Sequence, residues 1–272
     1  MRNLKVLAYH EVNNPNVFKQ QMQWLKQHYT IISLEELDHL RKEQTNFDGY
    51  LLITFDDGER SVYENGLPLL KSFNLPAAVF IVVNYIGTLK PFWWQTVNYY
   101  FKDKPALEKN SFTRKYKQAS LTAREKLMQE LVTNSDFPDF EYKQLTLEEL
   151  KKLHTNNVAI ANHTASHYFL NELAAEEQKK EIETAQEFLN TNGFLGDYLA
   201  YPNGFYNAET STVLQNSSIK MAFLFDHKIN IGADEFTISR LSVNSGTPMW
   251  KFKFILSGWH SKLLKYRLML KI

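Results

Sequence analysis

The chain has 272 residues, with 31 basic and 30 acidic side chains, no cysteine, and aromatic residues at 14% of its length. This length is enough for one large domain and is typical of a (β/α) barrel. The missing cysteine excludes disulfides, thiol catalysis and thiolate metal sites, and the near-neutral charge argues against a nucleic-acid partner. No stretch has the length of an apolar transmembrane helix.

Apolar runs along the chain predict strands that alternate with helices. The predicted strands cover residues 5–10, 30–32, 51–55, 77–83, 158–161, 198–201, 221–225 and 236–243. The predicted helices begin near Phe18, Ser33, Leu67, Thr146, Glu176, Ser211 and Thr247. Such alternation predicts a parallel α/β architecture, and seven or eight strands without a GxGxxG motif favour a barrel over a dinucleotide-binding sheet.

The strand at 51–55 ends in two adjacent carboxylates, Asp56 and Asp57, followed by Gly58. Two like charges repel each other, so their position at the end of a buried strand indicates a use for them. A cation could bind to one carboxylate, and a proton could be exchanged on the other. The alternative at this point is an Asx-rich turn that caps the next helix.

The pattern changes between about residues 91 and 145, where aromatic clusters and a polar helix predict an insertion. Phe92, Trp93 and Trp94 follow a predicted strand closely. We expect Trp93 and Trp94 to bind the substrate, as part of a wall or lid that packs against a sugar ring. The alternative is that these rings form a satellite core.

Two histidines four residues apart, His163 and His167, follow the strand at 158–161. On a helical turn this spacing places both rings on one face, where they can bind one metal ion. Thr164 stands where a zinc peptidase of the HExxH type needs glutamate, which argues against that class. Together with Asp57, the histidines would leave coordination positions open for water and substrate.

The carboxyl ends of parallel barrel strands meet on one face, where active sites lie. Several polar residues are at or just past such ends in the predicted pattern. They are His10, Asp56, Asp57, His163, residues 201–203 and Asp226. We therefore expect these side chains to form one site.

Three motifs resemble those of the polysaccharide deacetylase family, the NodB-homology domain of family 4 carbohydrate esterases. In the family's order they are Thr54-Phe55-Asp56-Asp57-Gly58, His163-Thr164-Ala165-Ser166-His167 and Ala200-Tyr201-Pro202-Asn203-Gly204. The opening Leu7-Ala8-Tyr9-His10 resembles the branch that deacetylates exopolysaccharide. The resemblance covers most of the chain apart from the insertion. It implies a distorted (β/α)7-8 barrel, with residues 1–272 as a single deacetylase domain.

The resemblance also implies roles for individual residues. Asp56 matches the family's catalytic base, and Asp57, His163 and His167 match its ligands for a divalent metal, usually zinc. Asn203 matches the position whose backbone N–H stabilises the oxyanion, and Tyr201 and Pro202 match substrate-binding positions. The implied reaction is hydrolysis of an N-acyl group, in the first place N-acetyl, on an amino sugar of a glycan.

The chain departs from the family pattern at two points. Ala200 stands where many members carry an arginine that orients the base. Arg240 is our candidate replacement, and the alternative is a surface or salt-bridging arginine.

The family's late Leu-x-His element, which supplies the general acid, has no clean counterpart in this chain. Residues 255–260 resemble it, but we expect the closing helix to carry His260 to the far face of the barrel. His10 is therefore the first candidate for the acid, and His227 is the second.

Other functions remain open. One is a deformylase or deacetylase that acts on a lipid-linked or nucleotide-linked amino sugar, and another is an inactive barrel that binds glycan. A glycoside hydrolase is disfavoured, because neighbours in a strand point to opposite sides and cannot flank one glycosidic bond.

The C-terminal segment, about residues 248–272, is basic and amphipathic. No acid follows Glu235. Tryptophan with cations and aliphatic residues is typical of a segment at an anionic membrane surface, and the alternative is a helix docked on the barrel. The first apolar run is too short for a signal-peptide core, so we expect a cytoplasmic location, at the inner face of the membrane if this segment binds there. The sequence does not indicate an oligomeric state.

Overall fold

The computed structural model describes residues 3–43, 46–133, 140–230 and 234–261. The chain divides into two compact units, residues 1–84 with 147–272, and residues 85–146, and each is described by itself. Among the described residues, no helix combines the length and the apolar character that a membrane span needs.

The first unit is built on a parallel sheet. Its strands are β1 Lys5–Tyr9, β2 Thr30–Ile32, β3 Tyr50–Phe55, β4 Ala77–Ile81, β5 Val158–Asn162, β6 Leu195–Ala200, β7 Met221–Phe223 and β8 Leu241–Ser242. They follow the order β7-β6-β5-β4-β3-β1-β8, and β2 pairs with β3 beside this path. β1 pairs with residues 51–55 of β3 and so occupies one edge of that strand. On the other edge, β2 pairs with residues 50–52 and β4 pairs with residues 54–55.

Residues 235–242 join the two ends of this curled sheet. Ile238 N–H donates to Ala222 O, and Leu224 N–H donates to Ile238 O, so the segment runs beside β7. It continues into β8, which pairs with β1. The prediction of a distorted parallel barrel with a helical insertion is confirmed.

The predicted strand at 236–243 was too long, because only Leu241 and Ser242 form a strand. Of the N–H groups just before them, that of Ile238 bonds to β7, whereas those of Phe236 and Ser239 bond to side chains. Phe236 N–H donates to Asp234 Oδ1, and Ser239 N–H donates to Asn230 Oδ1. The backbone of this segment is therefore irregular where it closes the barrel.

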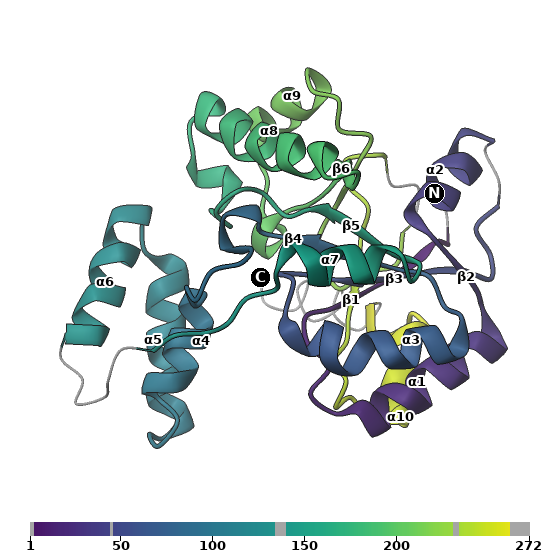
Figure 1. The fold of residues 1–272 in the computed structure, drawn as a ribbon, viewed down its shortest axis with the longest axis horizontal. Coiled ribbons are helices and arrows are strands. Elements are labelled where there is room, and N and C mark those ends of the chain that lie inside the picture. Colours follow the sequence, from purple (N-terminus) through teal and green to yellow (C-terminus); the bar gives the residue numbers. More distant parts are fainter. Residues whose placement is uncertain (1–2, 44–45, 134–139, 231–233, 262–272) are drawn as a thin grey trace. The chain divides into compact units, whose positions relative to one another are not determined.

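Each predicted barrel helix has a counterpart in the structure. The helices are α1 Pro15–His28, α2 Leu34–Lys42, α3 Leu67–Phe73, α7 Leu147–His154, α8 Ala175–Thr191, α9 Ala208–Gln215 and α10 Met249–Leu256. A capping box begins α2, since Ser33 Oγ accepts from Glu36 N–H and Glu36 Oε2 accepts from Ser33 N–H. Figure 1 shows α8 and α9 beside β6, and α1, α3 and α10 grouped together at the other end of the sheet.

The core inside the curled sheet comes from alternate residues of its strands. It includes Leu4, Val6, Leu52, Phe80, Ala159, Ala161, Tyr198, Ala200, Phe223 and Ile238. Side chains along a strand alternate between its two faces, so the same face continues two residues further on. Continued past the strand ends, this alternation leads to His10, Asp56 and His163. The core pattern thus places these three residues at the carboxyl end of the barrel interior. Arg240, two residues after Ile238, precedes β8 and reaches Asp56 through its long side chain.

The second unit contains α4 Trp93–Tyr100, α5 Ala106–Gln118 and α6 Leu121–Thr133. Its aromatic rings stack on one another. Ring centroids lie 4.4 Å apart for Phe92 and Trp94, and 4.2 Å apart for Trp93 and Tyr116. This packing supports the satellite-core alternative for these rings. Substrate binding by Trp93 and Trp94 stays a prediction, as does the single-domain organisation of the chain.

Candidate active site

The three predicted metal ligands lie together in the first unit. Asp57, His163 and His167 each offer a ligand atom, and these atoms all lie within 4.8 Å of one another. Each imidazole Nε2 is 3.3 Å from Asp57 Oδ1. That oxygen is buried and accepts no hydrogen bond from a described residue. A buried carboxylate oxygen between two imidazole nitrogens is a donor set that fits a divalent cation such as zinc.

The histidines converge through a loop and not through the helical turn that their spacing suggested. Thr164 and His167 adopt left-handed backbone angles, with φ of 68° and 62°. Asn162 and Thr164 hold this loop, because Asn162 Oδ1 accepts from Thr164 N–H and Thr164 Oγ1 accepts from His167 N–H. Asp57 has a φ of 70°, and such strained residues cost about 1–3 kcal/mol each and cluster at functional sites.

The orientation of the His163 ring is set from the neighbouring strand. Nδ1 lies 2.8 Å from Ala200 O, a carbonyl that can only accept, so Nδ1 carries the proton and the Nε2 lone pair faces Asp57. Burial lowers the pKa of His163, but Asp57 and Asp56 outweigh it and the pKa is raised. For His167 burial dominates, and the pKa is lowered.

Asp56 is held by a buried bidentate ion pair with Arg240. The guanidinium NH1 and NH2 groups donate to Asp56 Oδ1 and Oδ2 at 2.6 and 2.7 Å. Arg240 also donates to Thr54 Oγ1 and Leu224 O, and its side chain is fully buried. Burial alone raises the pKa of Asp56, but Arg240 and then His163 overcome this effect, so its pKa lies below the ordinary value. Asp56 is therefore ionised at neutral pH.

The third motif forms a tight turn after β6. Asn203 has a φ of 53°, its N–H makes no hydrogen bond to a described residue, and its Nδ2 is buried without a partner. Gly204 has a φ of +74°, and a Cβ there would lie 2.5 Å from Phe225 N, so only glycine fits. The turn thus leaves an unused backbone donor at Asn203, as an oxyanion site needs.

The structure does not support the prediction that Tyr201 and Pro202 contact substrate. Both are buried, Tyr201 with only 1% of its surface exposed, and Tyr201 Oη donates to Phe236 O. Phe205 and Tyr206, which directly follow this motif, have exposed rings. The sequence motifs predicted no role for them. Tyr206 stacks on Tyr201, with centroids 5.4 Å apart.

His10 is the acid candidate that contacts the predicted ligands. Its Nε2 lies 4.0 Å from Asp57 Oδ2, and its side chain is 41% exposed. Its ring meets the Phe225 ring edge-on, with centroids 5.2 Å apart. His10 therefore has both access to solvent and a place beside the three-residue cluster.

The expectation that His260 lies on the far face of the barrel stays a prediction, and the structure brings its segment to the loop after β7. Ser261 Oγ donates to His227 O, and a Cβ on Gly258 would meet Ile229 at 2.7 Å. The turn after α10 thus returns the chain to the loop after β7. Burial, and then His260, lower the pKa of His227.

A family model described as polysaccharide deacetylase matches residues 43–222. The chain belongs to the polysaccharide deacetylase family. The family resemblance and the prediction of a carbohydrate N-deacetylase are thereby confirmed. The deacetylase is 23% identical over 256 residues to poly-β-1,6-N-acetyl-D-glucosamine N-deacetylase of Staphylococcus epidermidis, covering 92% of this chain and 74% of that one.

Solved structures of other deacetylases share its fold, and two of them serve as examples. One is IcaB from Ammonifex degensii, with a TM-score of 0.68, 19% identity, and coverage of 94% of this chain and 97% of that one. The other is the Streptococcus pyogenes deacetylase PplD in complex with acetate, with a TM-score of 0.68 and 17% identity, covering 93% and 97%.

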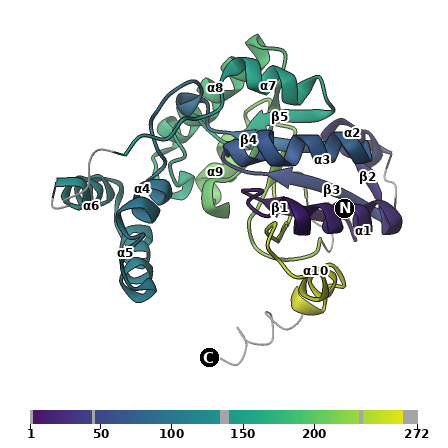
Figure 2. The ribbon, with the colours of Figure 1, turned by 60° about the horizontal axis from the view of Figure 1, so that its bottom comes forward.

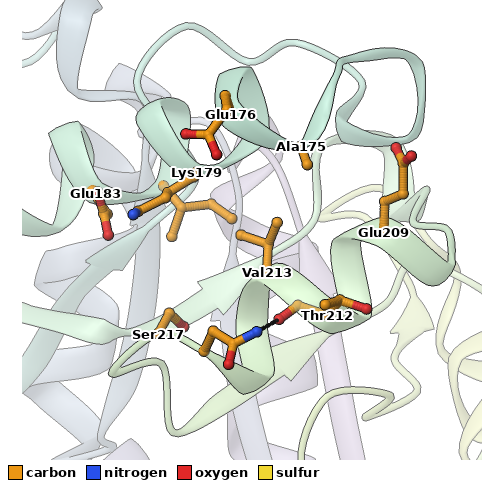
Figure 3. A pocket seen from close by; sticks show the side chains of 10 residues that line it. Ala175, Glu176, Lys179, Glu183, Glu209, Thr212, Val213 and Ser217 are labelled. Carbon is orange, nitrogen blue, oxygen red and sulfur yellow. Dashed lines mark hydrogen bonds between the residues drawn. The ribbon is translucent and has the colours of Figure 1, made fainter.

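A surface pocket of the deacetylase lies between α8 and α9 and not at this cluster (Figure 3). Glu176, Lys179 and Glu183 line it from α8, and Glu209 and Val213 line it from α9. None of its lining residues is a predicted catalytic or metal-binding residue. The predicted catalytic and metal-binding residues Asp56, Asp57 and His163 lie instead at the carboxyl ends of their strands.

The buried ion pair predicts the effect of removing Arg240. Arg240→Met leaves the Asp56 carboxylate buried without its partner, so the free energy of unfolding should fall by about 3–5 kcal/mol. The pKa of Asp56 should rise in this variant. Urea unfolding at neutral pH measures the first effect.

The double variant Asp56→Asn/Arg240→Met is the matched control. Without an unpaired charge it should be clearly more stable than Arg240→Met. If the two variants unfold at the same urea concentration, the pair does not act as described.

The deacetylase should bind about one divalent ion per chain, and His163→Ala and His167→Ala should each abolish this binding. Protons compete for His163 Nε2, whose pKa is raised above 6.5. Metal affinity should therefore fall as the pH is lowered, beginning above pH 6.5. Elemental analysis and titration calorimetry at two pH values measure both effects.

Asp56→Asn is the control for the metal site and should keep wild-type metal content. Wild-type content in His163→Ala would show that the ligands are wrongly assigned. Loss of metal in Asp56→Asn would make Asp56 a ligand.

Proposed function

We propose that this deacetylase hydrolyses an N-acetyl group on an amino sugar of a polysaccharide or glycan precursor, with a divalent metal, in the first place zinc. The observation that carries this proposal is the ionised Asp56, held by Arg240 directly beside the ligand cluster of Asp57, His163 and His167. The name of the staphylococcal relative, a poly-β-1,6-N-acetyl-D-glucosamine N-deacetylase, supports this substrate class.

Asp56 is suited to act as the general base. A cation held by Asp57, His163 and His167 would supply a Lewis acid that polarises the acyl carbonyl and lowers the pKa of water. Asp56 accepts a proton from the attacking water. Because both of its oxygens are bonded to Arg240, the carboxylate keeps one orientation while it does so.

Two further residues act on the acyl oxygen and on the leaving nitrogen. The free Asn203 N–H donates to the acyl oxygen as negative charge develops there. His10 donates a proton to the leaving nitrogen, and histidine is the side chain that most often performs such transfers. Its exposed ring lets it exchange that proton with solvent.

The alternative substrates differ in what the amino sugar is attached to: a polysaccharide, a lipid or a nucleotide. The exposed rings of Phe205 and Tyr206 support an oligomeric substrate, because aromatic rings pack on the apolar face of sugars. Lipid-linked and nucleotide-linked amino sugars would use the same chemistry. The intact Asp56, Asp57, His163 and His167 argue against an inactive glycan-binding barrel. The cytoplasmic location stays a prediction.

Acyl release from three substrate sets tests this proposal. β-1,6-linked N-acetylglucosamine oligosaccharides, UDP-linked amino sugars and polyprenyl-linked amino sugars should be compared with the metal-loaded protein. We expect acetate release from the oligosaccharides, with turnover lowered about 10²–10⁴-fold in Asp56→Asn. Absence of acetate or formate release from all three sets, with metal bound, would refute the proposal and favour a glycan-binding barrel.

The acid assignment predicts a specific kinetic defect in His10→Ala. The variant should keep its metal and its KM, while kcat falls about 10²–10⁴-fold. The alkaline limb of the kcat profile should disappear, because that limb reports loss of the acid's proton. His227→Ala is the matched control and should keep near-wild-type kcat. The reverse result would assign the acid to the loop after β7.

A further inference from the structure

The outer face of α10 carries exposed aromatic side chains. The helix buries Phe252, Ile255 and Leu256, and Phe252 lies edge-on to the ring of Trp24 in α1. Trp250 is 72% exposed and Trp259, just after the helix, is 61% exposed. These are the most exposed aromatic side chains among the described residues.

The same face is basic. Lys251 and Lys253 are exposed, and the Lys253 ammonium lies 5.6 Å from the Trp24 ring centroid. Trp250, Lys253 and Phe254 are three and four residues apart and therefore share one side of the helix. Figure 2 shows α10 beside α1 at the edge of the first unit.

Acidic side chains are missing from this part of the chain. Neither α10 nor α1, the helix it packs against, contains an aspartate or glutamate. No acid follows Glu235 in the sequence. The sequence after Ser261, outside the described residues, adds Lys262, Lys265, Arg267 and Lys271.

We propose that Trp250, Lys251, Lys253, Phe254 and Trp259 form a docking face for an anionic phospholipid bilayer. An indole ring suits the interface, because its apolar body is buried while its N–H group stays hydrated. Lysine stems lie along apolar surface while their ammonium groups reach phosphate headgroups. A soluble polyanion would use the cations but would leave both indoles in water, so the combination favours a bilayer.

Vesicle co-sedimentation of the full chain tests this proposal without reference to enzymatic activity. Vesicles of phosphatidylglycerol and phosphatidylcholine should bind the protein, and vesicles of phosphatidylcholine alone should bind it much more weakly. In Trp250→Ser/Lys251→Gln/Lys253→Gln, the loss of two cations alone should weaken binding roughly 30-fold. Raised salt should weaken wild-type binding in the same direction.

A matched variant in α5 and the turn before it, Leu107→Ala/Lys104→Gln/Lys115→Gln, removes one exposed apolar side chain and two exposed charges elsewhere. It should bind vesicles like the wild type. Equal binding by the wild type and the α10 variant would overturn the proposal, as would absence of vesicle binding by the wild type. Self-association that is lost on Trp250→Ser, without vesicle binding, would instead make this face a contact between copies of the chain.

Because the measurement is binding, it stands or fails independently of acyl release. Vesicle binding without acyl release would leave the docking face intact and refute the proposed function. Acyl release without vesicle binding would do the reverse.

Discussion

The buried pair of Arg240 and Asp56 is the interaction on which the rest of the site depends. A guanidinium and a carboxylate out of water are stable only when every strong donor and acceptor is satisfied. Arg240 meets this condition by bonding to Asp56 and Thr54 at the end of β3 and to Leu224 O after β7. One side chain thus links β3 to the segment that closes the barrel.

The pair also explains how the barrel closes through an irregular segment. Residues 236–240 form no regular strand, and their N–H groups bond partly to the side chains of Asp234 and Asn230. The guanidinium donors of Arg240 supply cross-links that a longer β8 would otherwise provide. Arg240, which fixes the Asp56 carboxylate, therefore also holds the last part of the sheet against β7.

Two different kinds of local structure deliver the chemical groups to the site. Asp56, His163 and His10 continue the inward alternation of their strands, so the same pattern that builds the core also aims them. Asp57 and His167 depend on left-handed backbone angles, which cost energy that the surrounding hydrogen bonds must offset. The proposed base is thus placed by regular structure, whereas two of the proposed ligands are placed by strained turns.

The position of Ala200 departs from the pattern that the family resemblance implied, which was an arginine that orients the base. Here the Ala200 carbonyl fixes the ring of His163. The small side chain of Ala200 belongs to the same core cluster as Phe80, over whose ring Arg240 lies at 5.6 Å. The orienting guanidinium reaches Asp56 from residue 240, along a different part of the chain.

The sequence by itself determined the parallel barrel, the insertion, and the set of Asp57, His163 and His167, which the structure brings together beside Asp56. These features lie in short segments, where side-chain alternation and motif spacing depend only on near neighbours. Only the tertiary structure decided that Arg240 pairs with Asp56, that Tyr201 is buried, and that His260 returns toward His227. Each of these outcomes joins residues far apart in the chain, so it depends on how the barrel closes and not on any local pattern.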